Sequence, residues 1–346
     1  MIEEVNQKKF KELMQKRLSK KSDTKAVVGW FYKHSETVVT YGDFGLNNPE
    51  SMSFQIASVT KLFTATLASV FHYNGKLDLK QRIGDYLQLD ANSTIRMMKV
   101  EDLLTHHAGL PSAPKELLGR YDKLNPYKHV TKEKLMDYLN NYRKPLKSKS
   151  SFQYSNLGFG ILGQVLEEIS GKTYEELVKE EICQPLEIEN IWITRPEKDI
   201  NLAPGAMRRN KELSRWELNA IGAAGAIDAN IKDMLKFAKG NLRGHPFYLK
   251  CAICHKANRT VSKHFDVGLG WMITRHEGIG ELHSHNGSTG GFNSFIGIHP
   301  EGRFGVVVLT NCRLPILNLI GLSNDHAAAI GFEGLKYISK KFYNAH

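Results

Sequence analysis

A serine and a lysine stand three residues apart at the start of an apolar segment, FQIASVTKLFTATLASVF. If this segment is helical, Ser58 and Lys61 share one face of the helix, and the free backbone NH groups of its N-terminus lie near Ser58. A serine hydroxyl becomes an effective nucleophile when a base takes its proton, and a lysine is such a base when desolvation lowers its pKa. Apolar residues surround Lys61 in the sequence. The pair therefore predicts acyl transfer through a covalent serine intermediate.

Two polar motifs further along the chain would complete such a site. Tyr154 and Asn156 lie in YSN, just before a second apolar segment. A tyrosine near a lysine can relay the nucleophile's proton, and an asparagine amide offers a donor and an acceptor to a substrate amide. The third motif, HNGSTGGF, begins at His285 and leads into a β-rich segment. Its glycines permit close approach of a substrate, and the backbone NH of Ser288 would be an oxyanion donor.

Each motif has a plain structural alternative when it is taken alone. Serine caps helices, lysine extends its amine from a helix to solvent, and the other two segments have the composition of a helix-entry loop and a tight turn. The same spacings recur elsewhere, as S-x-x-K at Ser22 and Ser112, Y-x-N at Tyr138, and H-x-G at His107 and His276. Only Ser58 opens a long apolar helix, and only His285 is followed by a glycine-rich stretch.

The elements that must position these motifs follow a clear order along the chain. An amphipathic basic helix is predicted within residues 8–25, and two β-rich runs around a polar turn at 33–36 predict a hairpin. Helical periods extend from about 58 to 239. Strand patterns return from 267, before a closing helix across 326–342.

Because strands lie at both ends of the chain, the sequence predicts an α+β protein. One antiparallel sheet would be built from both chain ends and flanked by helices, with an inserted helical lobe. We expect a single domain over residues 1–346, with a sheet region at about 1–55 and 260–346 and a helical region at about 56–259. The site should lie between sheet and lobe, where concave pockets tend to form.

The three motifs in this order resemble the serine β-lactamase and penicillin-binding protein superfamily. The resemblance is to the group of class C β-lactamases, D-alanyl-D-alanine carboxypeptidases and related esterases. Four further segments are similar to landmarks of that group, namely GKLDLKQRIGDYL, LLTHHAGLP, GAAGAIDANIKDMLKFAK and VGLGW. The resemblance runs from about Lys25 to the final helix. It implies a β-lactamase/transpeptidase-like fold and a serine hydrolase.

The resemblance also implies a role for each catalytic residue. Ser58 would be the nucleophile that forms an acyl-enzyme, and Lys61 its base. Tyr154 would shuttle protons to the leaving group and from water. The backbone NH groups of Ser58 and Ser288 would form the oxyanion hole. No metal ion and no cofactor are implied.

Substrate contacts are implied for a second group of residues, namely Asn156, His285, Asn286, Gly287 and Ser288. Asn156 would hold the acyl-side amide, and His285 would lend electrostatic support. His285 stands where class C β-lactamases commonly carry Lys, and Asn286 where a Thr hydroxyl often helps bind a carboxylate. Since charge-assisted hydrogen bonds are the stronger ones, these changes predict poor β-lactamase turnover. We expect D-alanyl peptidase, carboxypeptidase-like or esterase activity, with a class C-like β-lactamase as the alternative.

Other site chemistry has less support in the sequence. The segment from Cys251 to His255 matches the C-x-x-C-H pattern of c-type haem attachment, and it is also compatible with a redox pair or half a zinc site. A second C-x-x-C is absent, and neither H-E-x-x-H nor H-x-H-x-D-H occurs. We therefore expect no haem and no metal. Whether Cys251 and Cys254 pair is left open.

Composition and charge limit the remaining possibilities. Hydrophobic residues make up 41% and charged residues 24%, as in folded water-soluble proteins, and no apolar run has the length of a membrane span. The N-terminal segment lacks a secretory signal pattern, which predicts a cytoplasmic protein, or a periplasmic or extracellular one if a leader has been removed. The net charge of +11 favours contact with an anionic surface or polymer, besides a small-molecule or peptide acyl substrate. No specific nucleic acid partner is predicted. A catalytically silent, penicillin-binding-like scaffold that binds anionic polymers is the alternative of another class.

Overall fold

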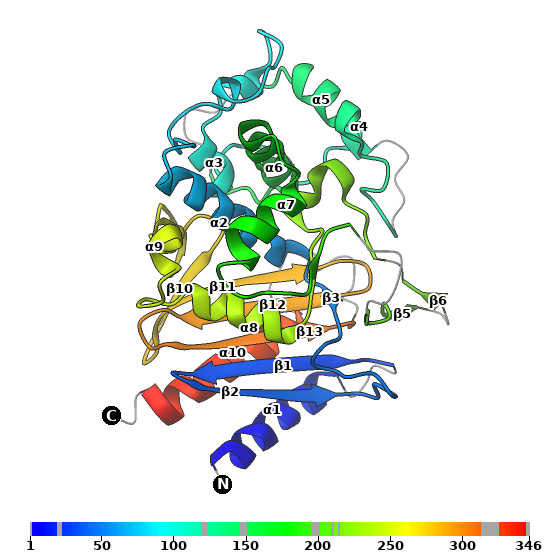
Figure 1. The fold of residues 1–346 in the computed structure, drawn as a ribbon, viewed down its shortest axis with the longest axis vertical. Helices are drawn as coiled ribbons and strands as arrows, with labels where there is room; N and C mark the ends of the chain where they lie inside the picture. The colour runs from blue at the N-terminus through cyan, green and yellow to red at the C-terminus, as the bar shows by residue number, and fades with distance from the viewer. Residues whose placement is uncertain are drawn as a thin grey trace.

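An eight-stranded antiparallel sheet forms the centre of the fold, with strand order β2-β1-β13-β12-β11-β10-β9-β8 (Figure 1). The computed structural model describes residues 2–18, 23–118, 124–145, 151–194, 201–208, 211–213, 215–312 and 325–343. The strands of the sheet are β1 (Ala26–Tyr32), β2 (Ser35–Tyr41), β8 (Arg259–Ser262), β9 (Phe265–Val267), β10 (Met272–His276), β11 (Gly280–Ser288), β12 (Asn293–His299) and β13 (Phe304–Thr310). Strand β1 pairs with β2 on one side and β13 on the other, which joins the two ends of the chain.

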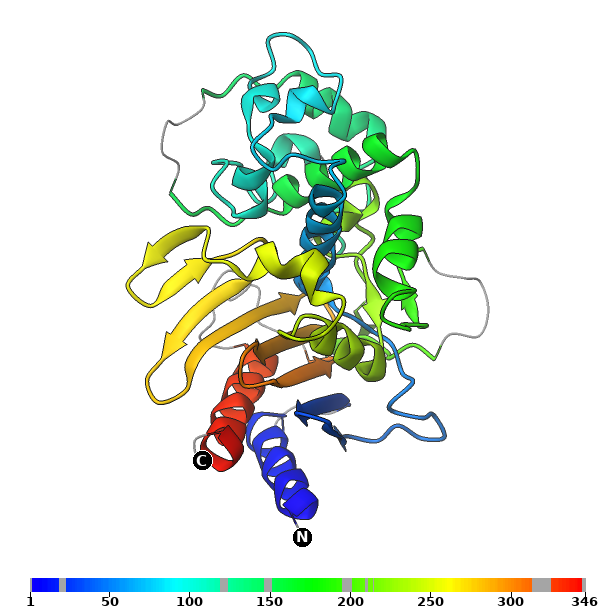
Figure 2. The same cartoon turned by 60° about the vertical axis from the view of Figure 1, so that its left-hand side comes forward.

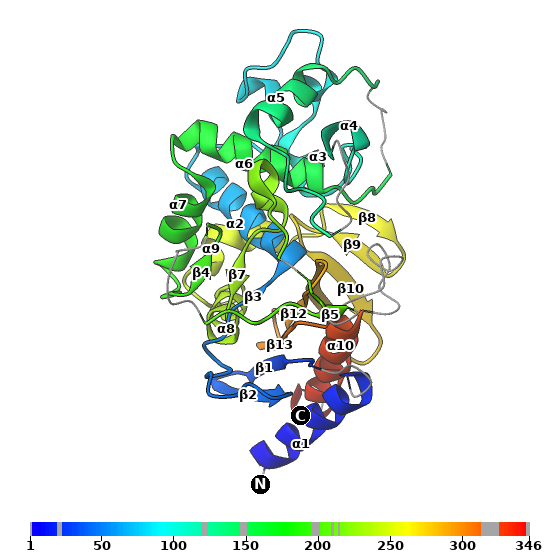
Figure 3. The same cartoon turned by 90° about the vertical axis from the view of Figure 1, so that its right-hand side faces the viewer.

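Helices cover both faces of this sheet. Helices α1 (Ile2–Leu18) and α10 (His326–Ile338) pack on one face, and α8 (Ile231–Gly240) packs on the other (Figure 3). Every residue of β12 and β13 is buried. A strand that is covered on both faces is expected to be apolar along its whole length, as FGVVVLT in β13 is.

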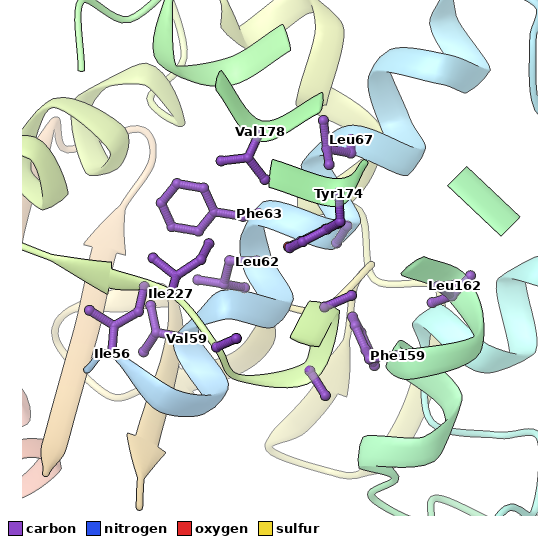
Figure 4. Packing of buried hydrophobic residues seen from close by; sticks show 14 of the residues in the cluster. Ile56, Val59, Leu62, Phe63, Leu67, Phe159, Leu162, Tyr174, Val178 and Ile227 are labelled. Carbon is purple, nitrogen blue, oxygen red and sulfur yellow. The ribbon is translucent and has the colours of Figure 1, made fainter. Parts of the chain in front are cut away.

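The helical lobe is built around α2, which runs between the lobe and the sheet (Figure 2). Its helices are α2 (Thr60–Tyr73), α3 (Val100–Leu104), α4 (Lys115–Leu118), α5 (Lys132–Asn140), α6 (Asn156–Ser170), α7 (Tyr174–Val178) and α9 (Tyr248–Cys251). All residues of α2 from Thr60 to Phe71 are buried. Leu62, Phe63 and Leu67 of α2 pack with side chains of α6 and α7 (Figure 4). This packing fixes the start of α2, which carries the predicted base and directly follows the predicted nucleophile.

Short strands occur inside the region predicted to be helical and at its N-terminal boundary. At that boundary β3 (Phe54–Gln55) forms a three-stranded sheet with β7 (Asp228–Ala229) and β4 (Ile191–Trp192), and β5 (Met207–Arg208) pairs with β6 (Lys211–Glu212). Pairings of two residues are too short to show the alternation that marks a strand in sequence. Strand β3 leads directly to Ser58 and holds the approach to α2 in place.

The α+β fold with one antiparallel sheet from both chain ends is confirmed. The predicted hairpin is β1 and β2 with a turn at Lys33 and His34. The basic N-terminal helix begins earlier than expected, because the described helix is Ile2–Leu18, and residues 19–22 of the expected helix lie outside the described residues. The boundaries of the sheet and helical regions within one domain remain a prediction. Among the described helices, none has the length and apolar character needed to cross a membrane.

Helix α10 approaches the sheet closely at Gly331, which predicts a large effect of adding one methyl group. A Cβ atom at this position would overlap the ring of Phe295 on β12. We expect Gly331→Ala to lower the free energy of unfolding by about 1–3 kcal/mol, because overpacking outweighs the higher helix propensity of alanine. Urea denaturation would measure this. Lys336→Ala on the exposed face of α10 is the control, and a more stable Gly331→Ala variant would contradict the expectation.

Candidate active site

Ser58 lies in a single 3-10 turn, Ala57–Val59, immediately before α2. Its neighbour Ala57 has a φ of 50°, a left-handed conformation that costs energy for a residue with a Cβ atom. The carbonyl oxygen of Ile56 accepts a hydrogen bond of 2.6 Å from Ser294 Oγ, which anchors this turn to β12. Ser58 itself is half-buried, so its hydroxyl lies at the boundary between protein and solvent. The backbone strain is therefore located beside the residue predicted to be the nucleophile.

Lys61 is completely buried one turn further along the helix. Its Nζ donates hydrogen bonds to Ser58 Oγ at 3.1 Å and to the carbonyl oxygen of Ala224 at 2.6 Å. No carboxylate among the described residues forms an ion pair with it. Burial lowers the pKa of Lys61 well below its usual value, because the ammonium form loses its hydration. The amine is thus available as a proton acceptor for the Ser58 hydroxyl.

Tyr154 lies just before α6, with its ring centroid 4.9 Å from Lys61 Nζ. Its hydroxyl interacts with the side chain of Ser58. Burial raises the pKa of Tyr154, and the interaction with Ser58 offsets only part of this effect. Tyr154 therefore keeps its proton at neutral pH, as a donor to a leaving group must. The structure brings the three predicted catalytic residues together around one oxygen atom.

The ring of His106 packs against the ring of Tyr154. His106 was not among the predicted site residues. The two ring centroids are 4.4 Å apart, and the backbone NH of Ser155 donates to His106 Nδ1 at 3.1 Å. Since Nδ1 accepts, the ring is neutral with its proton on Nε2. Burial and the nearby Lys61 lower the pKa of His106 well below its usual value. The LLTHHAGLP segment contained this residue, but nothing local indicated which of its two histidines faces inward.

Asn156 is held by a residue that the sequence did not identify. Its Nδ2 donates to the hydroxyl of Tyr127 at 2.8 Å, so the orientation of the amide is fixed. Its Oδ1 is buried and has no hydrogen-bond partner within the described chain. Tyr127 also makes an edge contact with Trp216, whose backbone NH and carbonyl oxygen both bond to the side chain of Gln55. An acceptor such as Asn156 Oδ1 suits the NH of a substrate amide.

The last predicted segment lies along the end of β11. Pairing of β11 with β10 ends at Ser284, opposite Met272, whereas pairing with β12 continues to Ser288. The edge from His285 to Ser288 is therefore open on the β10 side, where an extended substrate can add to it. A Cβ atom on Gly287 would overlap the carbonyl oxygen of Ile56 and lie 3.0 Å from the backbone nitrogen of Ser58. Only glycine fits this close approach between β11 and the turn Ala57–Val59 that carries Ser58.

His285 and Asn286 have contacts that differ from simple electrostatic support. His285 Nδ1 donates to the carbonyl oxygen of Asn286 at 2.7 Å, so a lone pair remains on Nε2, which has no partner among the described residues. Burial and the neighbouring Lys61 lower the pKa of His285 to about 3. Asn286 Nδ2 donates to Asp325 Oδ2 at 2.5 Å. His285 is thus a neutral acceptor, and Asn286 is bound to a carboxylate.

The C-x-x-C-H segment belongs to the protein core. Cys251 and Cys254 are free, buried thiols, and burial raises the pKa of each one. His255 is bonded through Nε2 to Asn241 Oδ1 and through Nδ1 to His283 Nδ1, at 2.9 Å each. Across the described residues, no group of three or more acidic, His or Cys side chains is arranged to hold a metal ion.

Comparison with known proteins agrees with this geometry. A family model described as Beta-lactamase matches residues 6–318. The chain belongs to the beta-lactamase family. It is an enzyme of the serine hydrolase type found in that superfamily, in which the serine is the nucleophile.

Individual beta-lactamase relatives are distant in sequence. A beta-lactamase of Pseudomonas fluorescens is 24% identical over 80% of this chain and 86% of its own. The D-alanyl-D-alanine-carboxypeptidase/endopeptidase AmpH of Escherichia coli is 26% identical over 78% and 73%, respectively. Among solved structures, a class C beta-lactamase superposes with a TM-score of 0.82 at 20% identity, covering 97% of both chains. That likeness shows the fold alone.

Replacing Gly287 tests the close approach of β11 to Ser58. We expect Gly287→Ala to lower kcat/KM for p-nitrophenyl acetate by about 100-fold or more, because the added methyl group displaces the oxyanion donors. Ser284→Ala, upstream on the same strand, is the control. A folded Gly287→Ala variant with the parent's rate would show that this contact does not position the reaction.

Three buried histidines predict an acid-sensitive fold. Burial is the main cause that lowers the pKa of His106, His255 and His285. Below about pH 6.5 these histidines therefore bind protons in the unfolded chain but remain neutral in the folded chain. Stability is therefore fully present above that pH and falls by about 1.4 kcal/mol per histidine per pH unit below it.

Urea denaturation between pH 7.5 and 5.5 would measure this dependence. His106→Asn should show a shallower loss of stability, because one proton-binding group of the unfolded state is removed. Asparagine also tolerates the φ of 61° at this position. The exposed His264→Asn is the control, and an unchanged pH dependence in His106→Asn would contradict the assignment.

Proposed function

We propose that this enzyme hydrolyses peptide or ester bonds through an acyl-enzyme on Ser58, as a D-alanyl peptidase, carboxypeptidase-like enzyme or esterase. The observation that carries the proposal is the arrangement around Ser58 Oγ. The buried Lys61 amine, whose pKa is lowered well below its usual value, hydrogen-bonds to this oxygen, and the protonated Tyr154 hydroxyl interacts with the same side chain. One group is suited to take a proton and the other to give one.

Acylation follows from these protonation states. The oxygen of Ser58 attacks the acyl carbon, and its proton passes to Lys61 Nζ. The backbone NH groups of Ser58 and Ser288 stabilise the oxyanion of the tetrahedral intermediate. When the bond to the leaving group breaks, Tyr154 gives its proton to the departing oxygen or nitrogen and regains one from Lys61. The products are an ester on Ser58 and a free alcohol or amine.

Deacylation uses the same groups in the opposite direction. A water molecule attacks the acyl carbon, and its proton passes through Tyr154 and Lys61 to the oxygen of Ser58 as the bond to the acyl group breaks. The unpartnered Oδ1 of Asn156 can accept a hydrogen bond from the acyl-side amide throughout both steps. The products are a free acid and the original Ser58 hydroxyl.

Efficient β-lactamase action is the alternative activity, and the names of several relatives favour it. The contacts of the third motif weigh against it. His285 is neutral, and an amide NH of Asn286 is bound to Asp325, so neither supplies a cation to a penicillin carboxylate. The AmpH relative is named as a carboxypeptidase and endopeptidase, which supports a peptidase in the same family.

A silent scaffold that binds anionic polymers through the basic surface is the alternative of another class. A protein that only binds polymers does not need a buried lysine beside the strained turn that carries Ser58. Burying an amine and holding Ala57 in a left-handed conformation both cost stability. The retention of both features supports catalysis.

Intact-protein mass spectrometry tests the proposal. We expect an acyl adduct on the parent after exposure to an activated ester, p-nitrophenyl acetate, and none on Ser58→Ala. Benzylpenicillin should label the parent slowly, and its adduct should turn over poorly. Ser51→Ala, an exposed serine outside the site, is the control and should label like the parent.

Each other outcome has a definite meaning. Rapid labelling and rapid release of penicillin would favour the β-lactamase alternative. Absence of any adduct on folded parent protein would favour the scaffold. Equal labelling of Ser58→Ala would exclude Ser58 as the nucleophile.

A further inference from the structure

The leaving group of a bound acyl donor must lie near His285. Tyr154 gives its proton to the leaving group, and the rings of Tyr154 and His285 have centroids 6.1 Å apart. The open edge of β11 begins at His285 and passes the nucleophile at Gly287. Groups around the start of this edge therefore determine which leaving groups fit.

The side chain of His285 offers this region a lone pair. Its only ring NH is used in the bond to the carbonyl oxygen of Asn286, and the buried Nε2 is an unpartnered acceptor in the described structure. A carboxylate brings only acceptors, so it gains no hydrogen bond from this lone pair. A hydroxyl or an NH group would satisfy it.

Asp325 places a carboxyl group behind the same segment; burial raises its pKa, and hydrogen bonds from Ala328 and Asn286 oppose this rise. Its side chain is 1% exposed, with Oδ2 bonded to Asn286 Nδ2 at 2.5 Å and Oδ1 bonded to the backbone NH of Ala328 at 2.9 Å. The second bond caps the N-terminus of α10, where a carboxylate is stabilised by the helix dipole. No lysine or arginine among the described residues pairs with Asp325. Burial lowers the pKa of Lys61, the buried amine of the site, well below its usual value.

We infer that this site rejects acyl donors whose leaving group carries a carboxylate, and that Asp325 is the specificity-determining residue. The favoured substrates are then esters or amides with an uncharged or cationic leaving group. This inference rests on the proposed function and narrows it, because a carboxypeptidase substrate and a penicillin both carry a carboxylate beside the bond that breaks. It favours an esterase, or a peptidase acting within a chain.

A pair of matched esters tests the inference. Hydrolysis of phenyl acetate and of 3-carboxyphenyl acetate is followed by release of the phenol, and kcat/KM is compared. In the parent, we expect phenyl acetate to be preferred by about tenfold or more, the effect of one unit charge at roughly 10 Å with an effective dielectric constant of about 20. A ratio near one would overturn the inference.

Asp325→Asn removes the charge and keeps a residue that caps helices well. We expect the preference for phenyl acetate over the carboxylate ester to fall by about tenfold in this variant. Glu301→Gln removes an exposed carboxylate elsewhere and should leave the ratio as in the parent. An unchanged ratio in folded Asp325→Asn would show that Asp325 does not set the selectivity.

A cationic ester provides a test on the unmodified enzyme. 3-(Trimethylammonio)phenyl acetate carries a fixed positive charge, and its kcat/KM should equal or exceed that of phenyl acetate. A tenfold lower value would contradict the inference even if Asp325→Asn does not fold. Failure of the parent to hydrolyse phenyl acetate at a rate above Ser58→Ala would instead contradict the proposed function.

Discussion

Burial of one amine governs the chemistry of this protein. Lys61 lies on a helix whose first three turns are buried, and among the described residues its Nζ hydrogen-bonds to Ser58 Oγ and the carbonyl oxygen of Ala224. An ammonium ion in this position would lose its hydration without gaining a carboxylate, so the neutral form is favoured. The apolar packing of the lobe around α2 therefore has a chemical consequence, because it lowers the pKa of Lys61 and so suits this amine to the proposed role of base for Ser58.

The sheet contributes the other half of the site, because its strands β11 and β12 lie close to the turn that carries Ser58. Ser294 on β12 fixes the carbonyl oxygen of Ile56, and Gly287 on β11 allows the backbone of that strand to reach the nitrogen of Ser58. The early end of the pairing with β10 leaves the same part of β11 open. The backbone nitrogen of Ser58 and an open strand edge thus lie close together, although they come from segments more than 200 residues apart in the chain.

The sequence predicted the parts of this site that have local signals. Ser58 and Tyr154 precede apolar helices, Lys61 lies in the first turn of one, and the glycines after His285 mark a strand that approaches another backbone. Tyr127, Trp216 and Asp325 have no such signal, because each reaches the site through a contact with a residue far away in the chain. The two-residue strands β3, β4 and β7 were missed for a related reason, since their pairing is decided by tertiary structure and leaves no period in the sequence.

Net charge was the weakest guide to the site. The chain carries a formal charge of +11, yet the basic groups beside Ser58, namely Lys61, His106 and His285, are all buried, and burial lowers the pKa of each. The charged group nearest to His285 and Asn286 in the hydrogen-bond network is the carboxylate Asp325. Because a buried charge is screened much less than an exposed one, the local field at the site follows these few groups rather than the many surface lysines. The same burial that prepares Lys61 as a base therefore removes the positive charge that would attract an anionic substrate.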